Sequence, residues 1–116
     1  MSMASDELAE RIRLQLARDP HVSERRMFGG IAFMAHGNML VGPMKDGSLL
    51  VRCGKAAYQQ TLTLPGAAPM EFTGRAMSGF VVVAGDAIED DKSLAQWIDI
   101  ARAFVRTLPP KEGGRD

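Results

Sequence analysis

The chain has 116 residues, the size of one domain, of which 46% are hydrophobic and 24% charged. Its 14 basic and 14 acidic side chains give a formal net charge of zero, which argues against non-specific nucleic-acid binding, because that function needs a basic excess. One cysteine rules out a disulfide within the chain, and no apolar stretch approaches the roughly 20 residues of a membrane span.

The first predicted element is a helix over residues 6–18. Three apolar residues spaced by four form one stripe on it, namely Leu8, Ile12 and Leu16. Ser5 is the expected N-cap, and Asp19 followed by Pro20 ends the helix, because a residue before proline avoids the α conformation. The first ten residues contain no apolar run of the signal-peptide type, so we expect a cytoplasmic protein.

A meander of β-strands is predicted next. We expect strands over residues 22–28, 31–35, 39–44 and 48–53, with turn-forming tripeptides at residues 36–38 and 45–47. Two adjacent glycines, Gly29 and Gly30, interrupt the first part of this region, and glycine weakens a strand interior. The first two segments are therefore either two strands or one long strand bent at the glycine pair.

The second half of the chain is predicted to add a short helix, one or two strands and a long helix. The short helix covers residues 55–62, and the strands cover residues 70–73 and 79–84. Asp90 or Asp91 is the expected N-cap of the long helix, whose apolar residues follow helical spacing: Leu94, Trp97, Ile98, Ala101, Phe104, Val105 and Leu108. The stretch "GFVVVA" is typical of a strand buried on both faces or placed in the centre of a sheet. Two prolines after Leu108 end the last helix.

This order of elements predicts a two-layer α+β fold. We expect an antiparallel sheet with helices packed on one face, in the order α-β(3-4)-α-β(1-2)-α. A single domain over residues 1–110 accounts for all the predicted elements, and residues 111–116 are expected to form a disordered tail.

Two segments of the predicted sheet share an arginine, a Met-x-Gly sequence and a following apolar run: "RMFGGIAF" and "RAMSGFVVV". A strand glycine permits a bulge, or the close approach of another backbone or a ligand, whereas packing alone is the competing explanation. The residues offered here for binding a partner or a ligand are Arg25, Arg26, Met27, Phe28, Gly29, Gly30, Arg75, Met77 and Gly79. We expect at least one of Gly29→Ala and Gly30→Ala to destabilise the fold, and Asn38→Ala, in an exposed turn, to be milder.

The sequence offers no catalytic or metal-binding motif. Cys53 ends an apolar strand, and nothing in the spacing brings His21 or His36 to it, so it is expected to be a small core residue and not a nucleophile. Two isolated histidines do not supply the convergent ligands that a metal site needs. The sequence "CGKAA" lacks the spacing and the hydroxyl of a phosphate-binding loop. We therefore expect no enzymatic activity, no metal and no cofactor.

Charge gathers in two places along the chain. The acidic cluster before the last helix, Asp86, Glu89, Asp90 and Asp91, is explained by capping of the helix and its dipole. Basic residues gather in the first quarter at Arg11, Arg13, Arg18, Arg25 and Arg26. They form either a solvated face or a docking surface for an acidic patch, which a second copy of the chain in a homodimer could supply.

The stretch "RRMFGGIAFMAHGNMLVGPMKDGSLLVR", followed by "FTGRAMSGFVVV", resembles the N-terminal domain of the TfoX/Sxy family in the order and spacing of its short motifs. The resemblance covers roughly residues 8–108. It implies an α-β(3)-α-β(2)-α fold and a role in regulating natural competence, as a coactivator acting with the cyclic-AMP receptor protein. The family's two-domain regulators carry a further helical domain, so we expect a stand-alone N-terminal domain.

The sequence therefore favours a non-enzymatic regulatory domain that binds another protein, with a transcription regulator as the expected partner. The alternative is a module that binds a small molecule or an anion at the glycine-marked strand positions. The zero net charge and the lack of a helix-turn-helix or zinc-ligand pattern predict no sequence-specific binding of DNA by the chain itself.

Overall fold

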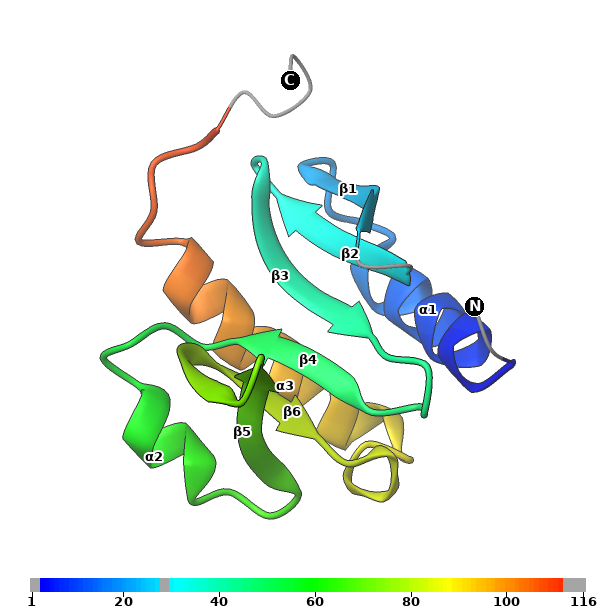
Figure 1. Cartoon of the computed structure of the whole chain (residues 1–116). Helices are drawn as coiled ribbons and strands as arrows, with labels where there is room; N and C mark the ends of the chain where they lie inside the picture. The colour runs from blue at the N-terminus through cyan, green and yellow to red at the C-terminus, as the bar shows by residue number, and fades with distance from the viewer. Residues whose placement is uncertain (1–2, 28–29, 112–116) are drawn as a thin grey trace.

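The computed structural model describes residues 3–27 and 30–111. Six antiparallel strands form one sheet, and three helices pack on one of its faces, which confirms the predicted fold class (Figure 1). The helices are α1 (Met3–Leu16), α2 (Tyr58–Leu62) and α3 (Asp91–Val105), with a short 3-10 turn, η1 (Gly85–Ala87), before α3. The strands are β1 (Val22–Met27), β2 (Gly30–Ala35), β3 (Asn38–Pro43), β4 (Leu49–Arg52), β5 (Ala67–Phe72) and β6 (Arg75–Val83).

The strands lie in the order β1-β2-β3-β4-β6-β5. β1 pairs with β2 in antiparallel register, with Met27 opposite Gly30, so the chain reverses between these two residues. The alternative of one long strand bent at Gly29 and Gly30 is therefore wrong. Phe28 and Gly29 lie outside the described residues, and the expected destabilisation by alanine at the glycine pair stays a prediction.

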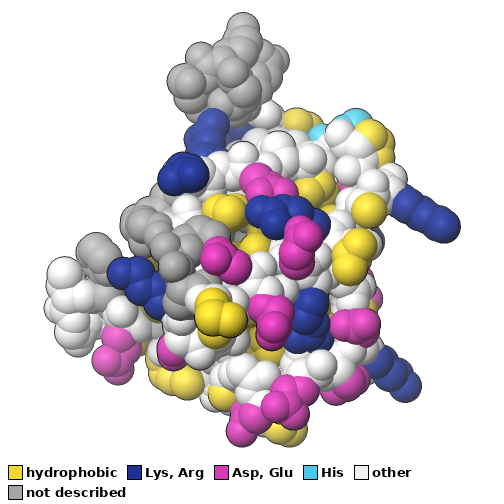
Figure 2. All heavy atoms as spheres, turned by 90° about the vertical axis from the view of Figure 1, so that its right-hand side faces the viewer, with side chains coloured by type: hydrophobic (Ala, Val, Ile, Leu, Met, Phe, Trp, Pro, Cys, Tyr) yellow, Lys and Arg dark blue, Asp and Glu magenta, His cyan; other side chains and the backbone are white. Residues whose placement is uncertain are grey.

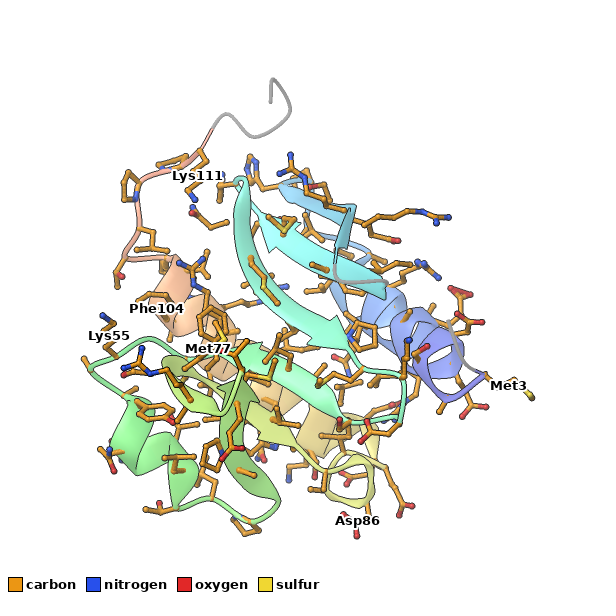
Figure 3. The ribbon with its side chains drawn as sticks, in the orientation of Figure 1. Met3, Lys55, Met77, Asp86, Phe104 and Lys111 are labelled. Atoms are coloured by element: carbon orange, nitrogen blue, oxygen red, sulfur yellow. The ribbon has the colours of Figure 1, made fainter. Side chains whose placement is uncertain are left out.

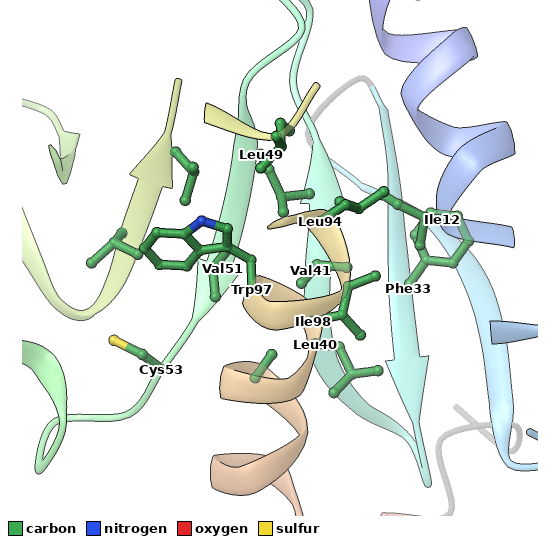
Figure 4. Close-up of a cluster of buried hydrophobic side chains, with 14 of the residues drawn as sticks. Ile12, Phe33, Leu40, Val41, Leu49, Val51, Cys53, Leu94, Trp97 and Ile98 are labelled. Atoms are coloured by element: carbon green, nitrogen blue, oxygen red, sulfur yellow. The ribbon is translucent and has the colours of Figure 1, made fainter. Parts of the chain in front are cut away.

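Helix α3 closes the hydrophobic core, as its apolar spacing predicts. Its buried stripe consists of Leu94, Trp97, Ile98, Ala101 and Val105. This stripe packs on β3 and β4, against side chains such as Val41 and Val51 that are fully removed from solvent (Figure 4). Asp90 caps the helix by accepting a hydrogen bond from the Ser93 amide at 3.0 Å, which confirms one of the two predicted caps.

Helix α1 lies beside α3 behind the sheet in Figure 1, and Leu8, Ile12 and Leu16 face the core as predicted. The helix already includes Met3, three residues before the predicted start. Ser5 is inside the helix and 2% exposed, so its assignment as the N-cap is wrong. None of the helices in the described part of the chain is long and apolar enough to cross a membrane.

Strand β6 contains most of the run "GFVVVA", predicted to be buried on both faces or to lie in the centre of the sheet. Only one face of the strand is buried. Val81 and Val83 are fully buried under the helices, whereas Phe80 and Val82 point to the other face and remain half-buried. The strand lies between β4 and the edge strand β5, so it is an inner strand of the sheet but not its centre.

The segment after α3 is held to the turn between β2 and β3. The Lys111 amide donates a hydrogen bond to the His36 carbonyl oxygen at 2.7 Å, and the Asn38 side-chain amide donates one to the Pro109 carbonyl oxygen at 3.1 Å. Asn38 is 2% exposed, so the expectation that it sits in an exposed turn is wrong. Lys111, the first residue of the expected tail, is hydrogen-bonded, and residues 112–116 lie outside the described part.

We predict that Asn38→Ala lowers the free energy of unfolding by about 0.5–1.5 kcal/mol, because it removes a partly buried hydrogen bond. Denaturant melts of the full chain and of a chain ended after Leu108 form the test. In the shortened chain the bond to Pro109 no longer exists, so the substitution should cost little there. An equal cost in both backgrounds would show that this hydrogen bond does not explain the burial of Asn38.

Candidate interaction surface

The structure separates the predicted binding residues into two groups. Arg25 and Arg26 are exposed on β1, an edge strand, whereas Arg75 and Met77 are exposed on β6, with β2, β3 and β4 between. Within the first group, Arg25 lies opposite Ala32 on the face away from the helices, and Arg26 lies opposite Ile31, which packs against the core. The described residues of the two similar segments therefore do not form one site.

The glycine of the second segment, Gly79, makes a close approach to another backbone. It has a φ of +95°, and a Cβ built on it would lie 3.4 Å from the carbonyl carbon of Gly54 and 3.4 Å from the amide nitrogen of Lys55. Its carbonyl oxygen accepts hydrogen bonds from the amides of Cys53 and Gly54, at 2.9 and 3.0 Å. The chain's own backbone thus occupies the space beside this strand glycine.

The same backbone segment receives an aromatic ring from the far end of α3. Gly54 has a φ of +84°, and a Cβ there would lie 2.6 Å from Cε1 of Phe104. The missing side chain at residue 54 therefore lets the Phe104 ring lie against the backbone just beyond the end of β4. Figure 3 shows Phe104, Lys55 and Met77 at this same end of the sheet.

The face of the sheet away from the helices, which we call the outer face, is unusually apolar. In an antiparallel sheet with one covered face, the other face normally alternates to polar residues. Here the outer positions of β2, β3, β4 and β6 include the half-buried Met39, Leu50, Phe80 and Val82, together with Ala32, Met34 and Gly42, which are buried. Strands β2, β3, β4 and β6 contain no Asp or Glu, and their charged residues are Arg52 and Arg75.

Arg52 is a charged residue on this outer face, at one end of the sheet. It ends β4 opposite Phe80 of β6, and its guanidinium carbon lies 5.9 Å from the centroid of the Phe80 ring and 5.3 Å from that of Phe104. Both distances are those of cation–π contacts. The side chain is half-buried, and burial lowers the pKa of Arg52 from its usual value.

The helical side of the molecule has a different character, because several of its basic residues are paired within the chain. Arg11 lies 3.2 Å from a carboxylate oxygen of Asp91, and Arg13 bonds Glu10 and Glu24 at 2.8 and 2.7 Å. The bond from Arg13 holds the pKa of Glu24 below its usual value. Figure 2, which views the molecule from the right-hand side of Figure 1, where α1 lies, shows basic and acidic side chains interspersed.

These pairs change the interpretation of the two charge clusters. The predicted contact between the basic first quarter and the acidic cluster exists within one chain, where Arg11 also donates to the Glu89 carbonyl oxygen at 3.1 Å. A shallow groove lies beside this pair, lined by Arg11, Leu14, Gln15, Ala17, Arg18 and Asp91. Leu14 is 78% exposed there.

Cys53 lies in the core, with 2% of its surface exposed. Its Sγ is 3.5 Å from the Gly79 carbonyl oxygen, and burial raises the pKa of the thiol. A raised pKa disfavours the thiolate that a nucleophile or a metal ligand requires. His21 and His36 stack on each other with ring centroids 4.1 Å apart, and the described residues contain no group of three or more His, Cys, Asp or Glu that could hold a metal.

Sequence reasoning missed Arg52, Phe80 and Phe104 as members of one cluster. The alternation in "LLVR" carried part of the signal, because Val51 faces the core and Arg52 must then face the opposite side with Leu50. The position of Phe104 beside them depends on how α3 crosses the sheet, which the sequence pattern does not specify.

Comparison with known families gives one clear result. A family model described as the TfoX N-terminal domain matches residues 14–105, from the last turn of α1 to the last residue of α3. The match therefore contains all six strands and the cluster around Arg52. Searches of curated proteins and of solved structures gave no match.

We predict that Gly54→Ala destabilises the fold more than Gly74→Ala. Both glycines have a positive φ, which costs alanine roughly 1–2 kcal/mol. Among the described atoms, a Cβ at Gly74 would have no neighbour within 4 Å, whereas one at Gly54 would overlap the Phe104 ring and add ~1–3 kcal/mol. Equal losses in denaturant melts would show that the ring adapts freely and is not held by the glycine.

We predict that Cys53 reacts with a thiol reagent orders of magnitude more slowly in the native chain than in the chain unfolded in guanidinium chloride. Because burial raises the pKa of the Cys53 thiol in the folded chain, this thiol stays protonated at a pH of about 8.5, where the thiol of the unfolded chain ionises. The free energy of unfolding therefore falls as the pH rises through that value, and Cys53→Ala should remove this dependence. Rapid native labelling, together with loss of function in Cys53→Ala, would contradict a purely structural role.

Proposed function

The chain belongs to the TfoX N-terminal domain family, which is associated with competence regulation, and we propose that it is a non-enzymatic regulatory domain that binds another protein. The observation that carries this proposal is the outer face of the sheet. Its inner strands present apolar side chains where an antiparallel sheet normally presents polar ones, and apolar surface that gathers on one face is typical of interaction sites.

The family's regulatory role favours a transcription regulator as the partner, and the two proteins would meet in the cytoplasm. Recognition of DNA sequence would then belong to the partner, since this chain has no net charge. The absence of a catalytic role is part of the proposal, and it is supported by the buried thiol of Cys53 and the raised pKa of that group.

The alternative of a small-molecule or anion site at the glycine-marked positions has less support. At Gly79 the backbone of Gly54 and Lys55 fills the space that a ligand would use. Arg75 and Met77 are exposed on the same strand and remain available to a partner.

Affinity capture from the native cell, with the full chain as bait, tests this function. We predict that wild type retains a regulatory protein and that Val82→Glu, which puts a carboxylate on the outer face, loses it. Gln59→Glu adds the same charge at an exposed position of α2 and should retain the partner.

Leu14→Glu distinguishes the outer face from the groove beside α1. If Leu14→Glu loses the captured protein and Val82→Glu keeps it, the contact surface lies on the helical side. If wild type retains nothing beyond what an unrelated bait retains, the protein-binding function itself is wrong.

A further inference from the structure

Arg52 has hydrogen-bonding capacity that the folded chain does not use. The guanidinium carries five N–H donors, and the side chain is half-buried between Phe80 and Phe104. Within residues 3–27 and 30–111, no hydrogen bond or ion pair of this side chain is found, whereas Arg11, Arg13 and Arg102 all pair with carboxylates. A partly desolvated cation in this position normally has a partner.

The two rings hold the guanidinium in place without satisfying its donors. A cation–π contact attracts the positive charge of the group to the rings but offers its N–H donors no oxygen acceptor. The five donors of the guanidinium therefore remain available. A carboxylate fits the edge of the guanidinium with two parallel hydrogen bonds.

The neighbouring positions on the outer face are apolar. Leu50 and Val82 lie beside Arg52 on the outer face, opposite each other across β4 and β6, and both are half-buried. Strands β2, β3, β4 and β6 contain no carboxylate, and Lys55 adds exposed positive charge at the same end of the sheet. A ligand that complements this surface has one or few negative charges and adjoining apolar groups.

From this geometry we infer that the outer face at Arg52 binds a segment of a partner protein in which an Asp or Glu is flanked by apolar residues. The carboxylate pairs with the edge of the Arg52 guanidinium, and the apolar residues cover Leu50 and Val82. The inference rests on the proposed protein-binding function and names the chemistry of the partner.

Two other occupants fit the surface less well. In the acidic cluster of a second copy, Asp91 is paired with Arg11 and Asp90 caps α3. The large apolar residue between Asp86 and Glu89, Ile88, is buried in the core and cannot cover the outer face. A nucleic acid needs several phosphate contacts, which a basic excess normally supplies, and this chain has zero net charge.

The test is selection of a phage-displayed library of random peptides on the immobilised full chain, followed by fluorescence anisotropy with the selected peptides. We expect the peptides to share an Asp or Glu between apolar residues. Replacing that residue by Asn or Gln should weaken binding at least about tenfold, as should Arg52→Gln. Arg18→Gln, which removes an exposed arginine after α1, should leave the affinity unchanged.

Two further variants keep the test independent of folding defects. Arg52→Lys keeps the charge but loses the planar fork, and we expect it to restore only part of the affinity. Arg52→Glu should not bind the acidic peptide, and it should bind the peptide in which Lys replaces the Asp or Glu. A peptide that binds wild type and Arg52→Gln equally, a selection without any acidic requirement, or a selection that yields no peptide would overturn the inference.

The remaining outcomes separate this inference from the proposed function. If the protein captured from the native cell binds the Arg52→Gln variant and wild type with equal affinity, the domain binds proteins but not through this arginine. If acidic peptides bind through Arg52 and no cellular protein is captured, the site stands and the regulatory function fails. If the chain self-associates and Arg52→Gln abolishes this, the partner is a second copy of the chain. If the chain binds DNA more tightly than the peptide, the partner is a nucleic acid.

Discussion

The packing of α3 across β3 and β4 is the interaction on which the rest of the structure depends. Its buried stripe includes Leu94 and Trp97, and burial of a side chain of this kind contributes about 1.5–3 kcal/mol. Helix α1 packs beside α3 on the same side, and Tyr58 of α2 joins the same core. The helices in the described part of the chain are therefore all committed to one face of the sheet.

The same helix also determines the character of the outer face. The C-terminal end of α3 brings Phe104 to the end of β4, where the absence of a side chain at Gly54 admits the ring. Arg52 then makes cation–π contacts with this ring and with Phe80. A carboxylate nearby would have paired with the arginine and stabilised the isolated domain. Because β2, β3, β4 and β6 contain no carboxylate, the Arg52 guanidinium stays positive, partly desolvated and surrounded by apolar side chains. Such a surface is suited to a partner that supplies the missing carboxylate.

Much of the fold could be predicted from the sequence because its strongest patterns are local. The stripe and cap of α3 and the core stripe of α1 follow from residue spacing alone. The reversal between Met27 and Gly30 could not be distinguished from a bend, because glycine suits both. Asn38 was assigned to an exposed turn because its partner, Pro109, is remote in the sequence. The cluster around Arg52 was missed for the same reason, since Phe104 reaches it only through the tertiary fold.

The most direct test of the central claim, that the outer face is the contact surface, is methyl-resolved NMR of the full chain titrated with the protein captured from the native cell. The account predicts that the methyl signals of Leu50 and Val82 shift on binding, while those of Leu14 on α1 remain in place. Shifts confined to Leu14 and its neighbours, with Leu50 and Val82 unchanged, would contradict it.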